Sequence, residues 1–153
     1  DDGLHLLDFV DRRGLERKLI NLRRRLKVVV LPGQHPVLQA AATQIKEYFA
    51  GRRFEFDLPL HPTGSAWERQ AWQHLQSIPP GTTQSYGEMA AALGRPGAAR
   101  AVGRANGMNY LSIIIPCHRV IAANGKLTGY GGGLWRKQWL LDHEQKHGRS
   151  ESH

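Results

Sequence analysis

The fold is decided by residues 85–106, which read SYGEMAAALGRPGAARAVGRAN. Ser85 and Glu88 have the spacing of a capping box, which predicts a helix from Tyr86 to Leu93. The four residues that follow, GRPG, predict a turn, and a second helix is expected from Ala98 to Asn106. Two short helices joined by such a turn are typical of a helix-turn-helix.

The second helix of this unit has almost no side-chain bulk. Ala99 and Gly103 leave its backbone free to approach another surface, and Arg100 and Arg104 add positive charge. A reader of the major groove would need longer polar side chains to reach the base edges. The pattern therefore favours the narrow minor groove or the phosphates of DNA, with tight burial in a protein core as the alternative.

Three further elements are expected around this unit. A second capping-box pattern upstream predicts a helix that starts near Ala66. Downstream, Ile113-Ile114-Ile115 is expected to form a short buried strand that Pro116 ends. A last helix is expected from Trp135 to Lys146, followed by a polar tail.

The N-terminal part begins with one strand-like and one helix-like pattern. A strand is expected over Leu4–Val10. Leucines at helical spacing predict a basic helix over Arg12–Leu26, with its apolar stripe packed on a sheet and its arginines and lysines in water.

Three weaker patterns follow before the chain changes character. They predict a short strand at Val28–Leu31, a helix from Pro36 to about Ala50, and a weak strand or extended linker over Phe54–Leu60. We therefore expect two domains, a small αβ domain of residues 1–59 with a partial sheet and a helix-turn-helix domain of residues 60–153.

Length and composition indicate an ordinary globular protein. The chain has 153 residues, of which 41% are hydrophobic and 22% charged, so a packed core is expected rather than disorder. No apolar run approaches the roughly 18 residues of a membrane helix, and no signal peptide stands at the start, which favours a cytosolic protein. The net charge of +8 favours a polyanionic partner such as nucleic acid, although a merely basic soluble protein has the same balance.

Cys117 is the one cysteine of the chain, which excludes an intramolecular disulfide and a multi-cysteine zinc site. A lone cysteine is more often a small core residue than a nucleophile. Here it follows the expected isoleucine strand and Pro116, where a thiol is held rigidly, and His118 beside it is a candidate base. The glycine-rich loop around Tyr130 lacks the spacing of a nucleotide-binding loop and is interpreted as a lid over a flat ring.

The sequence resembles the O6-alkylguanine-DNA alkyltransferases, also called methylated-DNA–protein-cysteine methyltransferases. The run Pro116-Cys117-His118-Arg119-Val120 is similar to the active-site signature of that family. The similarity extends at the expected spacing from about Gly64 to Glu144. It includes Ser85-Tyr86-Gly87-Glu88, Arg100-Ala101-Val102-Gly103, Asn109, Gly129-Tyr130, Gly132-Gly133, Lys137-Gln138-Trp139-Leu140-Leu141 and His143-Glu144.

The resemblance implies a fold, an activity and a partner. The fold would be a ribonuclease-H-like αβ domain followed by a winged helix-turn-helix-like domain. The activity would be direct-reversal DNA repair, in which a flipped O6-alkylguanine, with O4-alkylthymine as a further candidate, gives its alkyl group to Cys117 in a single turnover. The protein would act on double-stranded DNA as a monomer, with cooperative binding as an open question, and would need no metal or organic cofactor. It would work in the cytoplasm of a bacterium or in the nucleus of a eukaryote.

The resemblance also implies catalytic roles. Cys117 would accept the alkyl group, and His118 would act on it through a bound water, oriented by Glu144. Asn109 would be the hinge between the DNA-reading helix and the active-site strand, and Tyr86 would help to rotate the nucleotide and protonate the leaving base.

Binding roles follow from the same resemblance. Tyr130 and the backbone of Gly131 would border the guanine pocket, main-chain groups at Cys117 and Val120 would read the base edge, and Lys137 would support the site. Arg100 would fill the space of the flipped nucleotide. Ala99, Gly103 and Arg104 would complete the surface that meets DNA.

The sequence departs from the family pattern in three places. Tyr110 stands where the family usually has proline after the hinge asparagine, so either the hinge is looser or the tyrosine packs in its place. Asn106 stands where some relatives carry a larger side chain. The N-terminal half matches weakly, and we expect it to lack the first strands of the family's N-terminal domain.

Three other functions compete with the transferase. An alkyltransferase-like protein would bind and flip damaged bases without transfer, but the presence of Cys117 speaks against it. A transcription factor would use the helix-turn-helix at specific sequences and ignore lesions. A cysteine hydrolase, the weakest alternative, would show repeated turnover of an ester or amide.

Overall fold

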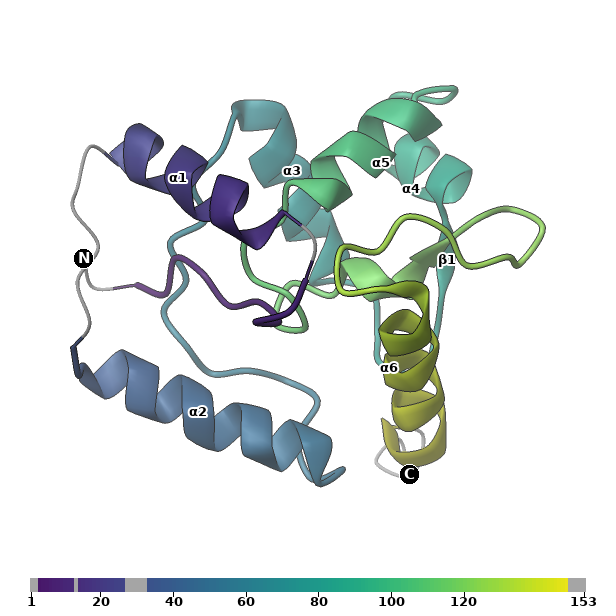
Figure 1. Ribbon diagram of the computed structural model, residues 1–153. Coiled ribbons are helices and arrows are strands. Elements are labelled where there is room, and N and C mark those ends of the chain that lie inside the picture. Colours follow the sequence, from purple (N-terminus) through teal and green to yellow (C-terminus); the bar gives the residue numbers. More distant parts are fainter. Residues whose placement is uncertain (1–2, 13, 27–32, 149–153) are drawn as a thin grey trace.

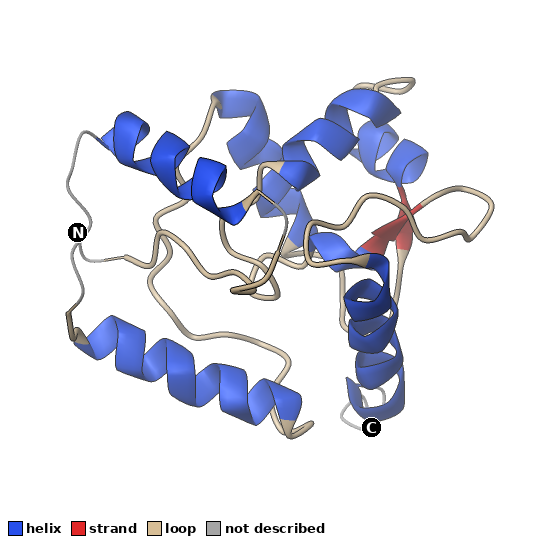
Figure 2. Ribbon diagram, in the orientation of Figure 1, coloured by secondary structure: helices blue, strands red, loops and turns tan. Residues whose placement is uncertain are grey.

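The computed structural model describes residues 3–12, 14–26 and 33–148 (Figure 1). The helices within these residues are α1 (Leu15–Leu26), α2 (Pro36–Phe49), α3 (Ala66–Leu75), α4 (Tyr86–Ala92), α5 (Ala99–Gly107), the short 3-10 helix η1 (Cys117–Arg119) and α6 (Leu134–His147). The strands β1 (Gln84–Ser85) and β2 (Val120–Ile121) pair in parallel. This two-stranded sheet lies between α4 and the long C-terminal helix α6 (Figure 2).

The helix-turn-helix prediction is confirmed by α4 and α5, with helix ends shifted by one residue. Ser85 caps α4 through the predicted capping box, in which its hydroxyl accepts from the Glu88 amide at 3.0 Å. The inner face of α5 packs against α3, where the Trp72 indole donates to the carbonyl of Ala105 at 2.8 Å. A buried, bonded tryptophan thus fixes how the second helix is presented.

The N-terminal half contains less sheet than expected. Within residues 4–10 the predicted strand is reduced to two isolated parallel bridges, from Leu4 to Leu60 and from Leu7 to Leu111. Its two partners belong to different parts of the chain, so no ladder can continue from one bridge to the next. Residues 54–59 form a loop with a bend at Glu55 and contain no strand. The strand expected at Val28–Leu31 lies outside the described residues.

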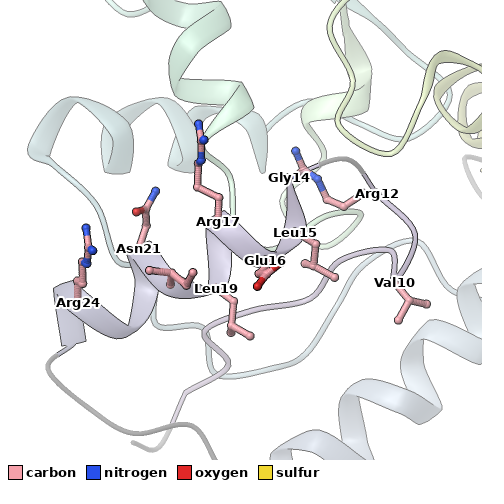
Figure 3. Close-up of a pocket in the computed structure, with 10 residues that line it drawn as sticks. Val10, Arg12, Gly14, Leu15, Glu16, Arg17, Leu19, Asn21 and Arg24 are labelled. Carbon is pink, nitrogen blue, oxygen red and sulfur yellow. The ribbon is translucent and has the colours of Figure 1, made fainter.

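Helix α1 differs from its prediction in one consequential side chain. Leu22 is buried in the main core and Leu26 packs against it, whereas Leu15 and Leu19 are only partly buried and line a surface hollow, so the leucine stripe packs in part on the core and not on a sheet. Lys18, expected to face water with the other basic residues, is 8% exposed. Figure 3 shows Arg17 and Arg24 projecting from one side of α1, along a hollow that they help to line.

The predicted strand at Ile113–Ile115 is wrong, because these residues form a tight turn. The backbone of Ile113 has a φ of 72°, and the Ile115 amide donates to the carbonyl of Leu111 at 2.9 Å. The carbonyl of Ile115 accepts from the side chain of Asn109 at 2.8 Å, so a side chain takes the place of a neighbouring strand. The turn is nevertheless buried, as the apolar run predicted.

No helix within residues 3–12, 14–26 and 33–148 is both long enough and apolar enough to cross a membrane.

Candidate active site

Cys117 is the first residue of η1 and comes directly after the isoleucine turn. Its side chain is half-buried, and its sulfur lies 3.4 Å from the Asn109 Nδ2, which donates to it. Burial raises the pKa of the thiol, while the Asn109 hydrogen bond and the charges of Lys18 and Lys137 act in the opposite direction. At neutral pH the group is therefore a thiol, and its use as a nucleophile requires a base.

Asn109 fixes the turn between α5 and Cys117 through three side-chain hydrogen bonds. Its Oδ1 accepts from the Leu111 amide at 2.9 Å, and its Nδ2 donates both to the Ile115 carbonyl and to the Cys117 sulfur. The side chain is buried, so these bonds are protected from water. The predicted hinge residue thus links the turn that follows α5 to the thiol.

His118 and Glu144 meet in the interior, both fully buried, with the His118 Nε2 2.7 Å from the Glu144 Oε2. Burial lowers the pKa of His118 in spite of the nearby carboxylate, which favours a neutral ring at neutral pH. If Nε2 carries the proton and donates to Glu144, Nδ1 is the basic nitrogen; this tautomer is inferred from the hydrogen bonds. Nδ1 is buried and has no hydrogen-bond partner among the described residues.

Two further partners of Glu144 had no role in the sequence prediction. Arg119 donates to both carboxylate oxygens, at 2.7 Å and 3.0 Å, and the Tyr48 hydroxyl donates at 2.7 Å. Although burial raises the pKa of Glu144, His118 and Arg119 hold it well below its usual range. Arg119 stands in the quoted signature, whereas Tyr48 lies on α2, 96 positions away, and no sequence spacing could reveal it.

Tyr86 and Lys137 meet at the carbonyl of Thr128, just before the glycine-rich loop. The Tyr86 hydroxyl donates to the Thr128 carbonyl at 3.2 Å, and the Lys137 ammonium donates to the same carbonyl at 2.8 Å and to the Tyr86 oxygen at 3.5 Å. Burial raises the pKa of Tyr86 and lowers the pKa of Lys137 to about 8. A cation beside a neutral phenol is an arrangement that can assist proton donation.

The remaining predicted pocket residues lie around the same loop. Tyr130 is half-buried, and its pKa is raised by burial and by the nearby Cys117. Gly131 is exposed and Val120 is buried in β2. Within the described ranges, no three or more His, Cys, Asp or Glu side chains are grouped so that they could hold a metal ion.

Helix α5 presents one buried and one exposed face. Val102 and Ala105 are buried, whereas Arg100 and Arg104 are exposed. Gly103 lies between these faces, and a Cβ atom on it would stand 3.9 Å from the Tyr86 ring. The alternative of a wholly buried helix is therefore wrong, and the basic face lies next to one of the candidate pocket residues.

The tyrosine that replaces the family's usual proline packs into the core. Tyr110 is 2% exposed, its ring meets the edge of Trp72 at 6.3 Å between centroids, and the Lys18 ammonium lies 5.6 Å from its centre. Of the two expectations for this position, a looser hinge or a packed tyrosine, the structure shows the packed tyrosine. The partly buried Ala99 lies at the start of α5, and Asn106 is buried at its end.

Comparison with known proteins shows which family the chain is similar to. Residues 66–146 match the family model "6-O-methylguanine DNA methyltransferase, DNA binding domain", and residues 1–62 match "6-O-methylguanine DNA methyltransferase, ribonuclease-like domain". The methylated-DNA–protein-cysteine methyltransferase of Mycolicibacterium paratuberculosis is 59% identical over 107 residues, which are 70% of this chain and 65% of that protein. The protein of the same name from Methanosarcina acetivorans is 44% identical over 135 residues, which are 86% of this chain and 85% of that protein.

A solved structure of Mycobacterium tuberculosis OGT in complex with DNA is similar over 95% of this chain and 83% of that one, with a TM-score of 0.80 and 43% identity. The chain spans less than two thirds of the length of the Mycolicibacterium protein, at 65%. The two family models confirm the expected fold class, a ribonuclease-like part with a DNA-binding part. The chain belongs to the 6-O-methylguanine DNA methyltransferase family.

Proposed function

We propose that this protein repairs DNA by moving an alkyl group from O6-alkylguanine to its own Cys117, once per molecule. The observation that carries the proposal is the environment of the thiol. Cys117 accepts a hydrogen bond from Asn109 and is followed by His118, whose Nε2 is 2.7 Å from a buried carboxylate. This arrangement provides a nucleophile, a base and a group that orients the base.

Transfer begins with removal of the thiol proton. The unpartnered Nδ1 of His118 takes that proton, directly or through a water, while Glu144 stabilises the imidazolium that forms. The sulfur lone pair then forms a bond to the alkyl carbon, and the bond from that carbon to O6 breaks. The thioether is not readily hydrolysed, so each molecule acts once.

The leaving guanine needs a proton or a hydrogen bond as the electron pair returns to it. Tyr86 is assigned this role, because its hydroxyl lies beside the Lys137 ammonium and its pKa is raised by burial. Tyr130 and Gly131 would border the base, and the backbone at Val120 would read its edge. O4-alkylthymine is a further candidate substrate for the same pocket.

The target carbon is out of reach in a stacked duplex, so the nucleotide must be rotated out. Arg100 would enter the stack from the exposed face of α5, while Ala99, Gly103 and Arg104 would allow and stabilise close approach to the DNA. We expect a monomer that acts on double-stranded DNA in the cytoplasm of a bacterial cell.

The proposal is tested by mass spectrometry after incubation with duplex DNA that contains O6-methylguanine. The expected result is a methyl-sized mass gain on one peptide, the one that contains Cys117, with one equivalent transferred per protein. The matched control, Cys117→Ser, should bind the same duplex and gain no mass. No gain in the wild-type protein, or a gain that persists in the variant, would refute the proposal.

The same experiment separates the rival functions. Tight binding of lesion-containing DNA without a mass gain would indicate a binding-only protein. Binding that depends on base sequence and ignores the lesion would indicate a transcription factor. Substitution of ethyl and benzyl for methyl in the substrate would then measure which alkyl groups the pocket accepts.

A further inference from the structure

A second buried carboxylate lies near Cys117, outside the sequence signature. The Oδ2 of Asp8 accepts from the Lys18 ammonium at 2.8 Å and from the Arg12 guanidinium at 2.9 Å. Its Oδ1 accepts from the Ser112 hydroxyl at 3.1 Å and from the Phe9 amide at 2.9 Å. The Asp8 side chain is only 2% exposed, so water is a poor substitute for these partners.

The carboxylate is ionised in this setting. Although burial raises the pKa of Asp8, the hydrogen bond and charge of Lys18 and the hydrogen bond of Arg12 lower it below its ordinary value. Burial lowers the pKa of Lys18, and Asp8 acts against that decrease. Near neutral pH the two groups therefore form a buried ion pair.

Residues 110–112, which lie between α5 and the thiol, are held by this ion pair and by the backbone next to it. The Leu7 amide donates to the Tyr110 carbonyl at 2.8 Å, and the Ser112 amide donates to the Leu7 carbonyl at 2.9 Å. Lys18 covers the Tyr110 ring, and Asp8 holds the Ser112 hydroxyl. Each end of the three-residue segment is thus held through both its backbone and its side chain.

The residue after this segment has a backbone conformation that its surroundings must impose. Ile113 has a φ of 72°, a conformation that a β-branched side chain adopts only when its surroundings impose it. Asn109 constrains the turn from one side, through Leu111 and Ile115. The hydrogen bond from Ser112 to Asp8 constrains the turn from the other side, immediately before the strained Ile113.

We propose that Asp8 and Lys18 are positioning residues for alkyl transfer, because their buried ion pair fixes residues 110–112 and thereby the turn that presents Cys117. The proposal rests on the proposed function of Cys117 as the acceptor. Neither residue forms a hydrogen bond with the thiol; they position it through Ser112 and Tyr110, and their charges also act on it. Arg12 extends the same cluster to the glycine-rich loop, since a methyl group on Gly131 would overlap its guanidinium.

The test measures the rate of transfer to Cys117 from saturating duplex DNA that contains O6-methylguanine, as a function of pH. Asp8→Asn and Lys18→Met should each lower the rate of the folded protein by about tenfold to a hundredfold, the usual cost of a small misplacement of a reacting group. Lys18→Arg, which keeps the charge, should restore most of the rate. Asp11→Asn is the matched control: Asp11 lies three positions away, is 67% exposed and pairs with Arg136, and its loss should change the rate less than about twofold.

The pH profile separates positioning from mere stability. Lys18 lowers the pKa of Cys117 and Asp8 raises it, so the profile should move to higher pH in Lys18→Met and to lower pH in Asp8→Asn. The other groups that act on or face the thiol are unchanged in both variants; they are Asn109, Lys137, Tyr86, Tyr130 and the proposed base His118. If the ion pair only stabilised the fold, its loss would lower the unfolding midpoint but leave the transfer rate and the pH profile of the folded protein unaltered. That result would overturn the proposal.

Ser112→Ala provides a milder variant in case the charged ones fold poorly. It removes the hydroxyl link to Asp8 and leaves the ion pair intact, and it should slow transfer by a few-fold with little loss of stability. Wild-type rates in this variant would also overturn the proposal. If the wild-type protein itself gains no alkyl group, the proposed function fails; if it does and Asp8→Asn and Ser112→Ala match it, the positioning proposal fails alone.

Discussion

Two buried carboxylates, Glu144 and Asp8, are bonded to residues on either side of Cys117 and differ in how far water can reach their partners. Glu144 and its partners His118 and Arg119 have side chains that are 0%, 0% and 5% exposed. Asp8 is 2% exposed, but its partners Arg12 and Lys18 are 15% and 8% exposed. Both carboxylates accept several hydrogen bonds, so the contrast lies in access of water rather than in the number of donors.

The contrast suggests a division of labour. A charge in fully dry surroundings depends entirely on its partners, so removal of one partner leaves a large uncompensated cost. Where water can reach the cations, it replaces part of what is lost. Glu144 should therefore dominate the stability of the fold, while Asp8 should matter more for the shape of the turn before Cys117.

Replacement of the drier carboxylate gives the largest expected effect. Glu144→Gln keeps the shape of the side chain but leaves the Arg119 guanidinium buried without a counter-charge, and it should cost about 3–5 kcal/mol in the free energy of unfolding. Asp8→Asn should cost less. Both values are measured by urea unfolding at pH 7.

The control for this comparison lies on the same helix. Asp142 is an exposed acid of α6, and Asp142→Asn should change the free energy of unfolding by no more than about 0.5 kcal/mol. An Asp8→Asn variant that loses as much stability as Glu144→Gln would contradict the idea that water access separates the two clusters.

A smaller effect is expected when one donor to Glu144 is removed. Tyr48→Phe keeps a ring that packs edge-on against Phe54, but deletes the hydroxyl that donates at 2.7 Å. Loss of a hydrogen bond to a charged group should destabilise the fold by about 1.5–3 kcal/mol. Thermal or urea unfolding checks this value, and an unchanged midpoint would mean that the other donors compensate fully.

The two clusters also differ in what sequence could reveal of them. The His118–Glu144 pair was predicted from the family signature, and the capping boxes at Ser65 and Ser85 predicted both helix starts from local chemistry. Asp8 gave no signal, because its partner Ser112 is 104 positions away and the helical spacing assigned Lys18 to the solvent side. Local patterns predict local structure, whereas a buried pair between distant segments depends on packing that single-sequence periodicity does not contain.

The failed strand at Ile113–Ile115 has the same origin. Three isoleucines favour extended structure, and their burial was predicted correctly. The turn is imposed by Asn109 and by Leu7, which take up hydrogen bonds that a strand would have shared with neighbours. Tertiary contacts here override the local preference.

As the pH falls, three buried groups should lower the stability of the fold in turn: first His118, then Glu144 and Asp8. The folded pKa of His118 is below its ordinary 6.5, so the unfolded state binds a proton first and stability falls as the pH drops below about 6.5. The folded pKa values of Glu144 and Asp8 are below 4.5 and 3.8, so their contributions are present above those values and are lost as the pH falls further. Urea midpoints at successive pH values should show a shallower decline below about pH 4 in Asp8→Asn, with the wild-type slope retained between 6.5 and 4.5.

The smallest effect is expected at Tyr110, which sharpens the comparison with Tyr48. Both tyrosines are buried, but the Tyr110 hydroxyl has no hydrogen-bond partner among the described residues, whereas the Tyr48 hydroxyl bonds to Glu144. Tyr110→Phe keeps the ring under Lys18 and against Trp72 and removes an unsatisfied polar group, so it should leave the free energy of unfolding unchanged or raise it by up to about 1 kcal/mol. Urea unfolding of the two phenylalanine variants side by side measures the difference. If Tyr110→Phe destabilised the fold as much as Tyr48→Phe, the hydroxyl at position 110 would have to be bonded, and the segment after Asn109 would owe its stability to that bond as well as to the packed ring.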